Sequence, residues 1–252
     1  DAKRGEMVVD FCAGAGGKTL AIGATMRSTG RLYAFDVSAH RLDALKPRMA
    51  RSGLSNIHPA AIAHERDERI KRLAGKIDRV LVDAPCSGLG TLRRNPDLKW
   101  RQSAKAVQEL VVKQAAILDS AARLLKPGGR LVYATCSMLP QENEAIAEAF
   151  TQAHRDFEPL DAGELLAQLK VPEAASLCSG GESGSLSTAR CPGSAATTGR
   201  ASPTHCGSIQ PSICTWKVAG RGPLFRIVTV YTAVAPHSTV RRRLSRVATI
   251  TS

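Results

Sequence analysis

Apolar runs and segments of helical periodicity alternate along this 252-residue chain, and this alternation constrains the fold more than any other feature. The runs that predict strands are residues 7–14, 31–37, 57–63, 77–85 and 129–137. The segments that predict helices, by spacing and stop signals, are residues 40–53, 107–125 and 141–154. The alternation predicts an α/β fold with a mainly parallel sheet and helices on both faces.

Two cysteines stand where predicted strands end. Cys86 follows the run IDRVLV in the segment DAPCSG, and Cys136 ends a later run in YATCS. In a doubly wound sheet, ligands bind outside the carboxyl ends of the strands. If these two strands are neighbours, both thiols and Asp83 face one cleft. A single cysteine is more often an inert core residue, so it is the joint placement that favours nucleophilic chemistry.

The segment DFCAGAGGKT joins the first predicted strand to a helix. Gly14, Gly16 and Gly17 allow close approach of the backbone, and the N–H groups of the helix start can hold a ligand. A tight structural turn is the alternative. Asp36 ends the next strand, where a carboxylate can accept both hydroxyls of a ribose, although it is also suited to be a helix N-cap. Together they predict a nucleoside cofactor.

Net charge and cysteine spacing indicate which partners and which kinds of site to expect. The net charge of +13 favours a polyanionic partner such as nucleic acid, but nine of the 35 basic residues and no acidic residue lie from Ser183 onward. The seven cysteines include no C-x2-C pair, so we expect no metal site. No apolar run approaches the roughly 20 residues of a membrane span. No signal peptide is visible, so we expect a cytoplasmic protein with reduced thiols and no membrane contact.

The composition changes near residue 178. We expect a catalytic domain at residues 1–177 and a basic tail rich in Ser, Thr and Gly at residues 178–252, largely disordered apart from the strand-like run PLFRIVTVYTAV. An altered reading frame is an alternative origin for this tail. The chain begins without Met and enters a strand almost at once, so we also expect it to be a fragment without its N-terminus.

Three motifs resemble the RNA cytosine-5 methyltransferase family, and most closely its B-type branch that modifies 16S ribosomal RNA. They are DFCAGAGGKT, DAPCSGLGTLRRNPDLKW and YATCSMLPQENE, which occur in the family's order and spacing. The resemblance covers about residues 5–160. It implies a Rossmann-like, S-adenosylmethionine-dependent methyltransferase sheet and a monomeric enzyme that acts on RNA, with ribosomal RNA as the substrate. Transfer RNA, or a catalytically silent remnant that binds RNA or cofactor, remain the alternatives.

The resemblance also implies roles for residues that match the motifs. Asp36 would hold the ribose of S-adenosylmethionine, Asp67 would lie near its adenine, and Asp83 would lie by its methyl group and the target base. Cys136 would be the nucleophile that adds to carbon 6 of cytosine, and Cys86 would help to release the product. A protonated Asp83 would hydrogen-bond the ring nitrogen where charge develops. The cofactor loop would consist of Cys12, Ala13, Gly14, Ala15, Gly16, Gly17 and Lys18.

Basic residues follow the first thiol in LGTLRRNPDLKWRQ. The resemblance favours contact with RNA phosphates, with Trp100 packing against the nucleic acid, whereas a solvated basic loop is the alternative. The chain differs from the family in having Gly14-Ala15 where Ala-Pro is usual, and in having no Asp-Gly-Phe-Phe-like motif after residue 160. The predicted RNA-binding residues are Arg93, Arg94, Lys99 and Arg101.

Overall fold

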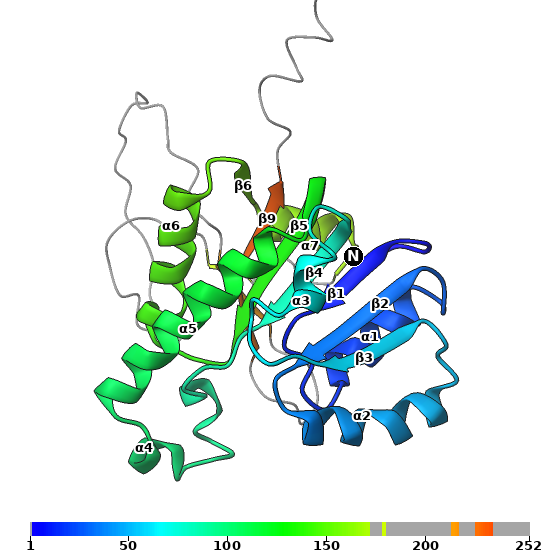
Figure 1. Ribbon diagram of the computed structural model, residues 1–252. Coiled ribbons are helices and arrows are strands. Elements are labelled where there is room, and N and C mark those ends of the chain that lie inside the picture. The colour runs from blue at the N-terminus through cyan, green and yellow to red at the C-terminus, as the bar shows by residue number, and fades with distance from the viewer. Residues whose placement is uncertain (1, 172–177, 180–212, 217–224, 234–252) are drawn as a thin grey trace, which may run out of the picture.

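A nine-stranded sheet with helices on both faces forms the centre of the molecule (Figure 1). The computed structural model describes residues 2–171, 178–179, 213–216 and 225–233. The strands lie in the order β3-β2-β1-β4-β5-β9-β8-β7, and β6 also pairs with β9. Neighbouring strands from β3 to β5 are parallel, which confirms the predicted fold class.

The parallel half of the sheet carries the five predicted strands and their connecting helices. Its strands are β1 (Met7–Asp10), β2 (Arg31–Asp36), β3 (Ile57–Ala61), β4 (Ile77–Asp83) and β5 (Leu125–Thr135). Its helices are α1 (Gly17–Thr25), α2 (Ala39–Ser52), α3 (Glu68–Lys71), α4 (Leu98–Arg101) and α5 (Ala104–Ala122), with a 3-10 turn η1 (Leu89–Thr91). The strand order reverses between β1 and β4, so the carboxyl ends of these two strands border a crevice suited to a ligand.

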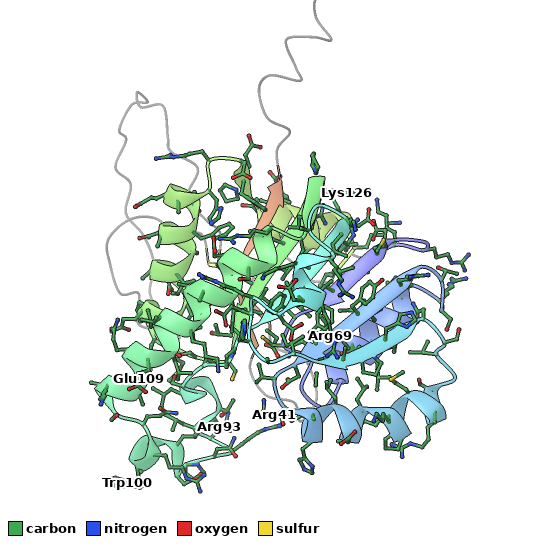
Figure 2. All side chains as sticks on the ribbon, viewed as in Figure 1. Arg41, Arg69, Arg93, Trp100, Glu109 and Lys126 are labelled. Carbon is green, nitrogen blue, oxygen red and sulfur yellow. The ribbon has the colours of Figure 1, made fainter. Side chains whose placement is uncertain are left out.

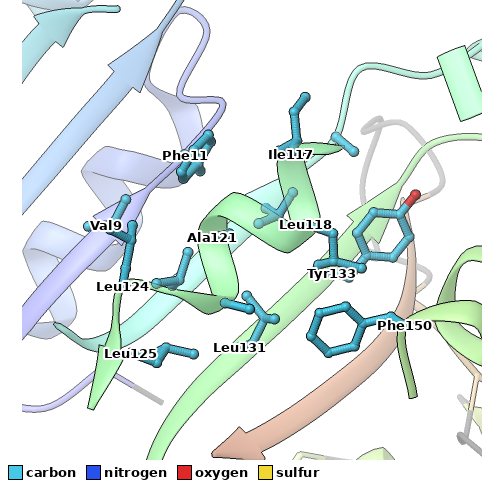
Figure 3. Close-up of a cluster of buried hydrophobic side chains, with 14 of the residues drawn as sticks. Val9, Phe11, Ile117, Leu118, Ala121, Leu124, Leu125, Leu131, Tyr133 and Phe150 are labelled. Carbon is cyan, nitrogen blue, oxygen red and sulfur yellow. The ribbon is translucent and has the colours of Figure 1, made fainter. Parts of the chain in front are cut away.

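Successive residues of the parallel strands pack against opposite faces of the sheet. Val8 contacts the cluster beneath α1 and α2, whereas Val9 contacts the cluster beneath α5. Figure 3 shows this second cluster, with Val9 and Phe11 on one side and Ile117, Leu118 and Ala121 of α5 on the other. Each such fully buried aliphatic side chain stabilises the fold by about 1.5–3 kcal/mol. The two apolar layers explain why the strands read as continuous apolar runs in the sequence.

Several boundaries differ from the sequence prediction, most clearly around β5 and α6. Helix α5 ends at Ala122, and β5 starts at Leu125 instead of residue 129, so the KPGG segment lies inside a strand. The pairing with β4 shifts register between Ile77 and Arg79, and this irregularity accommodates the segment. The helix predicted at 141–154 is divided into a 3-10 turn, η2 (Pro140–Glu142), and α6 (Glu144–Ala153).

The remaining elements lie on the other side of β5. They are β6 (Phe157–Leu160), α7 (Ala162–Gln168), β7 (Cys178–Ser179), β8 (Ile213–Trp216) and β9 (Phe225–Ala233). Strand β9 runs antiparallel between β5 and β8, and it forms from the run that we expected to be a strand. The other residues of the predicted tail lie outside the described ranges, apart from β7 and β8. Within the described ranges, no helix has the length and apolar character needed to cross a membrane.

Candidate active site

A cavity of about 530 Å³ lies at the carboxyl ends of the parallel strands. Its walls come from the turn after β1, the end of β2, the loop after β4, helix α5 and Cys136. The cavity therefore joins the glycine-rich turn and both candidate thiols in one space, as the sequence predicted for neighbouring strands. Its lining includes Cys12, Ala13, Gly14, Ala15, Asp36, Asp83, Cys86 and Cys136.

The two thiols are in direct contact. The Sγ atoms of Cys86 and Cys136 are 3.3 Å apart, and the backbone N–H of Cys136 donates to the Cys86 sulfur over 3.4 Å. The hydrogen bond from Cys86 lowers the pKa of Cys136. That same hydrogen bond, together with burial, raises the pKa of Cys86. Cys136 is thus the thiol that more readily becomes a thiolate, the reactive form of cysteine.

The glycine-rich turn is fixed by packing and by Asp36. Gly16 has φ 84°, and a Cβ built there would lie 2.1 Å from Leu45 of α2, so only glycine fits. The two carboxylate oxygens of Asp36 accept the N–H groups of Gly14 and Ser38, each over 2.8 Å. Ser38, and not Asp36, is the N-cap of α2. Asp36 therefore organises the turn while it also lines the cavity.

The comparisons with known proteins agree with this arrangement. The family described as 16S rRNA methyltransferase RsmB/F matches residues 1–176. This chain belongs to that family. The resemblance seen in the three motifs and the Rossmann-like methyltransferase fold are thereby confirmed.

Individual relatives of the family cover the same part of the chain. A probable ribosomal RNA small subunit methyltransferase B from Synechocystis is 44% identical over 155 residues, which are 60% of this chain and 34% of that protein. A protein of the same name from Bacillus subtilis is 38% identical over 174 residues, 69% of this chain and 38% of its own. The chain thus spans just over a third of the length of these curated relatives.

A solved structure gives the same result for the fold. The methyltransferase homolog protein from Pyrococcus horikoshii is 34% identical, with a TM-score of 0.55. The match covers 64% of this chain and 49% of that chain.

The resemblance implies that Lys18 and Asp83 both belong to the site, and the structure pairs them. Lys18 Nζ lies 2.5 Å from Asp83 Oδ2, although the residues come from α1 and the end of β4. This ion pair was not expected from the sequence. The sequence predicts a hydrogen bond from Asp83 to the ring nitrogen of the target base and gives no sign of Lys18 as its partner. Lys18 also contributes to the lowered pKa of Cys136, because a nearby cation favours the thiolate.

Cys12 and Asp67, both predicted to bind the cofactor, differ in their position relative to the cavity. Cys12 lines the cavity, but burial raises the pKa of its thiol, so it behaves as an inert thiol. Asp67 is the N-cap of α3, where its carboxylate accepts the N–H groups of Ala63 and Arg69. Asp67 does not line the cavity, whereas Glu65 does. Its predicted contact with adenine therefore has no support from its position.

Hydrogen bonds to the two thiol loops fix both ends of a basic segment. The N–H of Gly90 donates to the carbonyl of Cys136 over 2.9 Å, and the Gln102 side chain donates to the carbonyl of Ser87 over 2.9 Å. The segment between them, residues 91–101, projects outward with α4. Figure 2 shows Arg93 and Trp100 at the lower side of the molecule, together with Arg41 of α2. The four predicted RNA-binding residues on this segment are all exposed: Arg93, Arg94, Lys99 and Arg101.

The exposed groups of this segment suit a polyanion with stacked bases. Trp100 is 80% exposed, and Lys99 Nζ lies 4.8 Å from the centre of its ring. Arg101 is instead paired with Asp97 over 2.9 Å. Arg93 and Lys99 therefore offer their charge more directly than Arg101 does.

Several cavity residues were missed by the sequence analysis. Lys113 lies on α5 at a helical position that the periodicity leaves exposed, and Arg41 lies in the first turn of α2. Neither belongs to a motif, so only the fold brings them to the site. Among the described residues, no group of three or more His, Cys, Asp or Glu is placed to hold a metal ion.

Proposed function

We propose that this chain is the catalytic part of an enzyme that transfers a methyl group from S-adenosylmethionine to carbon 5 of cytosine in small-subunit ribosomal RNA. The observation that carries the proposal is the contact of Cys86 and Cys136, 3.3 Å apart, on a cavity that also includes the glycine-rich turn and Asp36. Membership of the RsmB/F family and relatives named as ribosomal RNA small subunit methyltransferase B support the substrate.

The residues of the cavity fit the cofactor. Its volume of about 530 Å³ falls within the roughly 300–1,000 Å³ of small-molecule sites. In the described chain, no side chain caps the N-terminus of α1, and the turn that leads into this helix, from Cys12 to Ala15, lines the cavity. Each Asp36 oxygen accepts one N–H group and keeps a lone pair for a ribose hydroxyl. Bound there, S-adenosylmethionine would supply an electrophilic methyl group.

Cys136 is proposed to be the nucleophile. Its thiolate adds to carbon 6 of cytosine, and the electron pair of the 5,6 double bond makes carbon 5 nucleophilic towards the methyl group. The lowered pKa favours this thiolate near neutral pH. Lys18 and Asp83 lie close enough to Cys136 to act on its charge, the cation favouring the thiolate and the carboxylate opposing it.

Cys86 is proposed to serve the release of the product. Once the Cys136 sulfur is bonded to carbon 6, it is no longer the thiolate whose hydrogen bond raises the pKa of Cys86. Cys86 then loses its proton to solvent, and its sulfur accepts the proton from carbon 5. The electron pair of that C–H bond restores the double bond, and the bond between carbon 6 and Cys136 breaks with its electron pair returning to sulfur. The 3.3 Å contact between the two sulfurs supports this proposal, because the two steps require both sulfurs to reach the same base.

The experiment uses the full chain, protein-free 16S ribosomal RNA and S-adenosylmethionine with a tritiated methyl group. The native chain should place label on carbon 5 of cytosine. Cys136→Ala should give neither label nor a covalent complex with RNA. Cys86→Ala should accumulate a protein–RNA adduct that survives denaturing electrophoresis. Cys12→Ala, which changes the third thiol of the cavity, should trap no adduct.

The alternatives correspond to other results of this experiment. An adduct trapped by Cys136→Ala and absent from Cys86→Ala would exchange the two roles. Label on transfer RNA alone would change the substrate. Binding of RNA without label or adduct from any variant would overturn the proposed activity in favour of a silent remnant.

Three further expectations belong to this proposal. We propose that the enzyme acts in the cytoplasm, as a monomer, and that residues 1–177 are its catalytic domain with residues 178–252 as an appended tail. The exposed Arg93 and Lys99 support RNA as the partner, because phosphate contacts fix the position of a nucleic acid on a protein.

A further inference from the structure

A fully buried carboxylate lies between the two thiol loops. Glu142, at the end of η2, has 0% of its surface exposed. Its Oε1 accepts the backbone N–H of Ser87 over 2.8 Å and the side-chain amide of Gln114 over 3.0 Å. Its Oε2 accepts the hydroxyl of Ser87 over 2.5 Å. One acid from the third motif thus holds the residue that directly follows the first thiol.

The two thiols contact each other, and so do the two serines that follow them in the chain. Cys86 contacts Cys136, and Ser87 contacts Ser137, with 3.1 Å between the two Oγ atoms. Each cysteine lines the cavity, whereas each serine is buried, with 1% exposure. The buried serine contact therefore supports the thiol contact from behind.

Glu142 sets the direction of the hydrogen bonds in this contact. A carboxylate only accepts, so the single hydroxyl proton of Ser87 points to Glu142. Ser87 then has no proton left for Ser137, and the Ser137 hydroxyl must donate to Ser87. The Ser137 oxygen in turn accepts the N–H of Leu139 over 3.0 Å. One charge thus orders the chain of donors from Leu139 through both serines.

Glu142 is itself held from two further sides. Its backbone carbonyl accepts the hydroxyl of Tyr133 on β5 over 2.8 Å. The Gln114 amide that donates to its side chain also donates to the carbonyl of Pro85 over 2.9 Å. A buried charge is costly without such partners, and satisfied networks of this kind make an arrangement rigid.

We propose that Glu142 is a positioning residue that locks the loops after β4 and β5 together and so keeps the sulfurs of Cys86 and Cys136 in contact. Its significance for methyl transfer rests on the proposed function, but the positioning itself does not. The geometry of the two thiols can be measured without RNA or cofactor, so failure of one proposal is distinguishable from failure of the other.

The test measures how fast the two thiols form a disulfide. The reduced chain is treated with diamide, whose N=N bond takes up the two protons and two electrons released by the thiols. After the reaction is stopped with iodoacetamide, trypsin releases residues 80–93 and 131–155, and mass spectrometry follows the disulfide-linked pair. Glu142→Gln keeps the shape but turns one acceptor into a donor, and it should slow the reaction about tenfold by loosening the alignment.

The controls separate positioning from general loosening. Glu148→Gln makes the same change at an exposed position of α6 and should react within about twofold of the native rate. Alkylation of Cys12 should be equal in all variants, because the hydrogen bonds of Glu142 described above go to Ser87, Gln114 and Tyr133 and not to the Cys12 loop. A Glu142→Gln rate equal to or faster than the native rate would overturn the proposal.

A second variant decides the matter if Glu142→Gln lacks a cooperative thermal transition. Ser137→Ala removes the serine contact but leaves every hydrogen bond of the Glu142 carboxylate in place. It should fold and slow disulfide formation about threefold, since one of the links between the loops is lost. An unchanged rate in folded Ser137→Ala would contradict the proposal.

Discussion

A buried carboxylate lies behind each side of the cavity, Asp10 on the cofactor side and Glu142 on the thiol side, and the two differ in their hydrogen-bond partners. Asp10, beneath the glycine-rich turn, receives one hydrogen bond from Thr19 over 2.7 Å, and its Oδ1 has no partner among the described residues. Glu142, behind the thiols, accepts three hydrogen bonds. Burial raises the pKa of Asp10 to about 6. The charged Asp10 carboxylate therefore destabilises the fold, whereas the Glu142 carboxylate links two loops.

This difference indicates how each half is held. The cofactor side depends on backbone geometry, with Gly16 packed on Leu45 and the turn fixed to Asp36. The thiol side depends on side-chain hydrogen bonds between two loops. A cofactor with polar groups needs exposed backbone donors, whereas two thiols need a fixed separation. Substitutions that alter the backbone conformation should therefore disrupt the cofactor side. Substitutions that alter side-chain hydrogen bonding should disrupt the thiol side.

The largest expected effect comes from breaking the backbone geometry of the cofactor side. Gly16→Ala forces a positive φ on alanine and places its Cβ against Leu45, which should lower the free energy of unfolding by about 3–5 kcal/mol. Gly14→Ala is the matched control, because its φ is also positive but no atom lies within 4 Å of a Cβ. It should cost about 1 kcal/mol. Equal losses in urea denaturation would show that packing on Leu45 is unimportant.

The next effect tests the unpaired charge of Asp10. Its folded pKa of about 6 exceeds the ordinary value of 3.8, so the folded state binds the proton more tightly. Stability from this group is therefore present below pH 4 and is lost as the pH rises to 6. Asp10→Asn removes this loss and should raise the free energy of unfolding above pH 6 by up to about 3 kcal/mol. Below pH 4 the two proteins should differ little, and a constant difference across this range would refute the assignment.

A third prediction concerns ligand binding on the cofactor side. Asp36→Ala removes the carboxylate that faces the cavity and holds the turn, and it should weaken S-adenosylmethionine binding by about 1.5–3 kcal/mol. Calorimetry measures this directly. Asp43→Ala changes an exposed acid of α2 and should leave the affinity intact. Equal affinity for native chain and Asp36→Ala would remove Asp36 from the binding site.

The smallest expected effect concerns the electrostatic interaction between the cofactor side and the thiol side. Lys18 comes from the cofactor side, yet its charge lowers the pKa of Cys136 on the thiol side. Lys18→Met should therefore raise the pKa of Cys136 and slow its alkylation by iodoacetamide at pH 7 by about threefold. The midpoint of the alkylation rate against pH should move upward. A midpoint that does not move would mean that the halves are electrostatically independent.

The sequence predicted what depends on local patterns. The five parallel strands follow from apolar runs, and the thiols and Asp36 were found because they stand at strand ends. The start of β5 was missed, because Pro127 and Gly128 signal a stop that pairing with β4 overrides. Local signals of this kind describe the chain before tertiary contacts act on it.

The contacts that complete the site could not be predicted in the same way. Lys18 and Asp83 are 65 residues apart, and Ser87 and Glu142 are 55 apart. Neither pair has a periodicity or spacing that distinguishes it from other charged or polar residues nearby. Only the neighbouring positions of β1, β4 and β5 bring their side chains together.

The position of β9 has a consequence for solubility. Its backbone pairs with β5 from Arg130 to Thr135, and it is also the strand with which β6 pairs. A chain shortened to residues 1–177 would therefore present the open hydrogen-bonding side of a long central strand to other molecules. Exposed strands of this kind recruit further copies and lead to aggregation. Strand β9 thus acts as a protective cover, and expression of the shortened chain should yield precipitate where the full chain stays in solution.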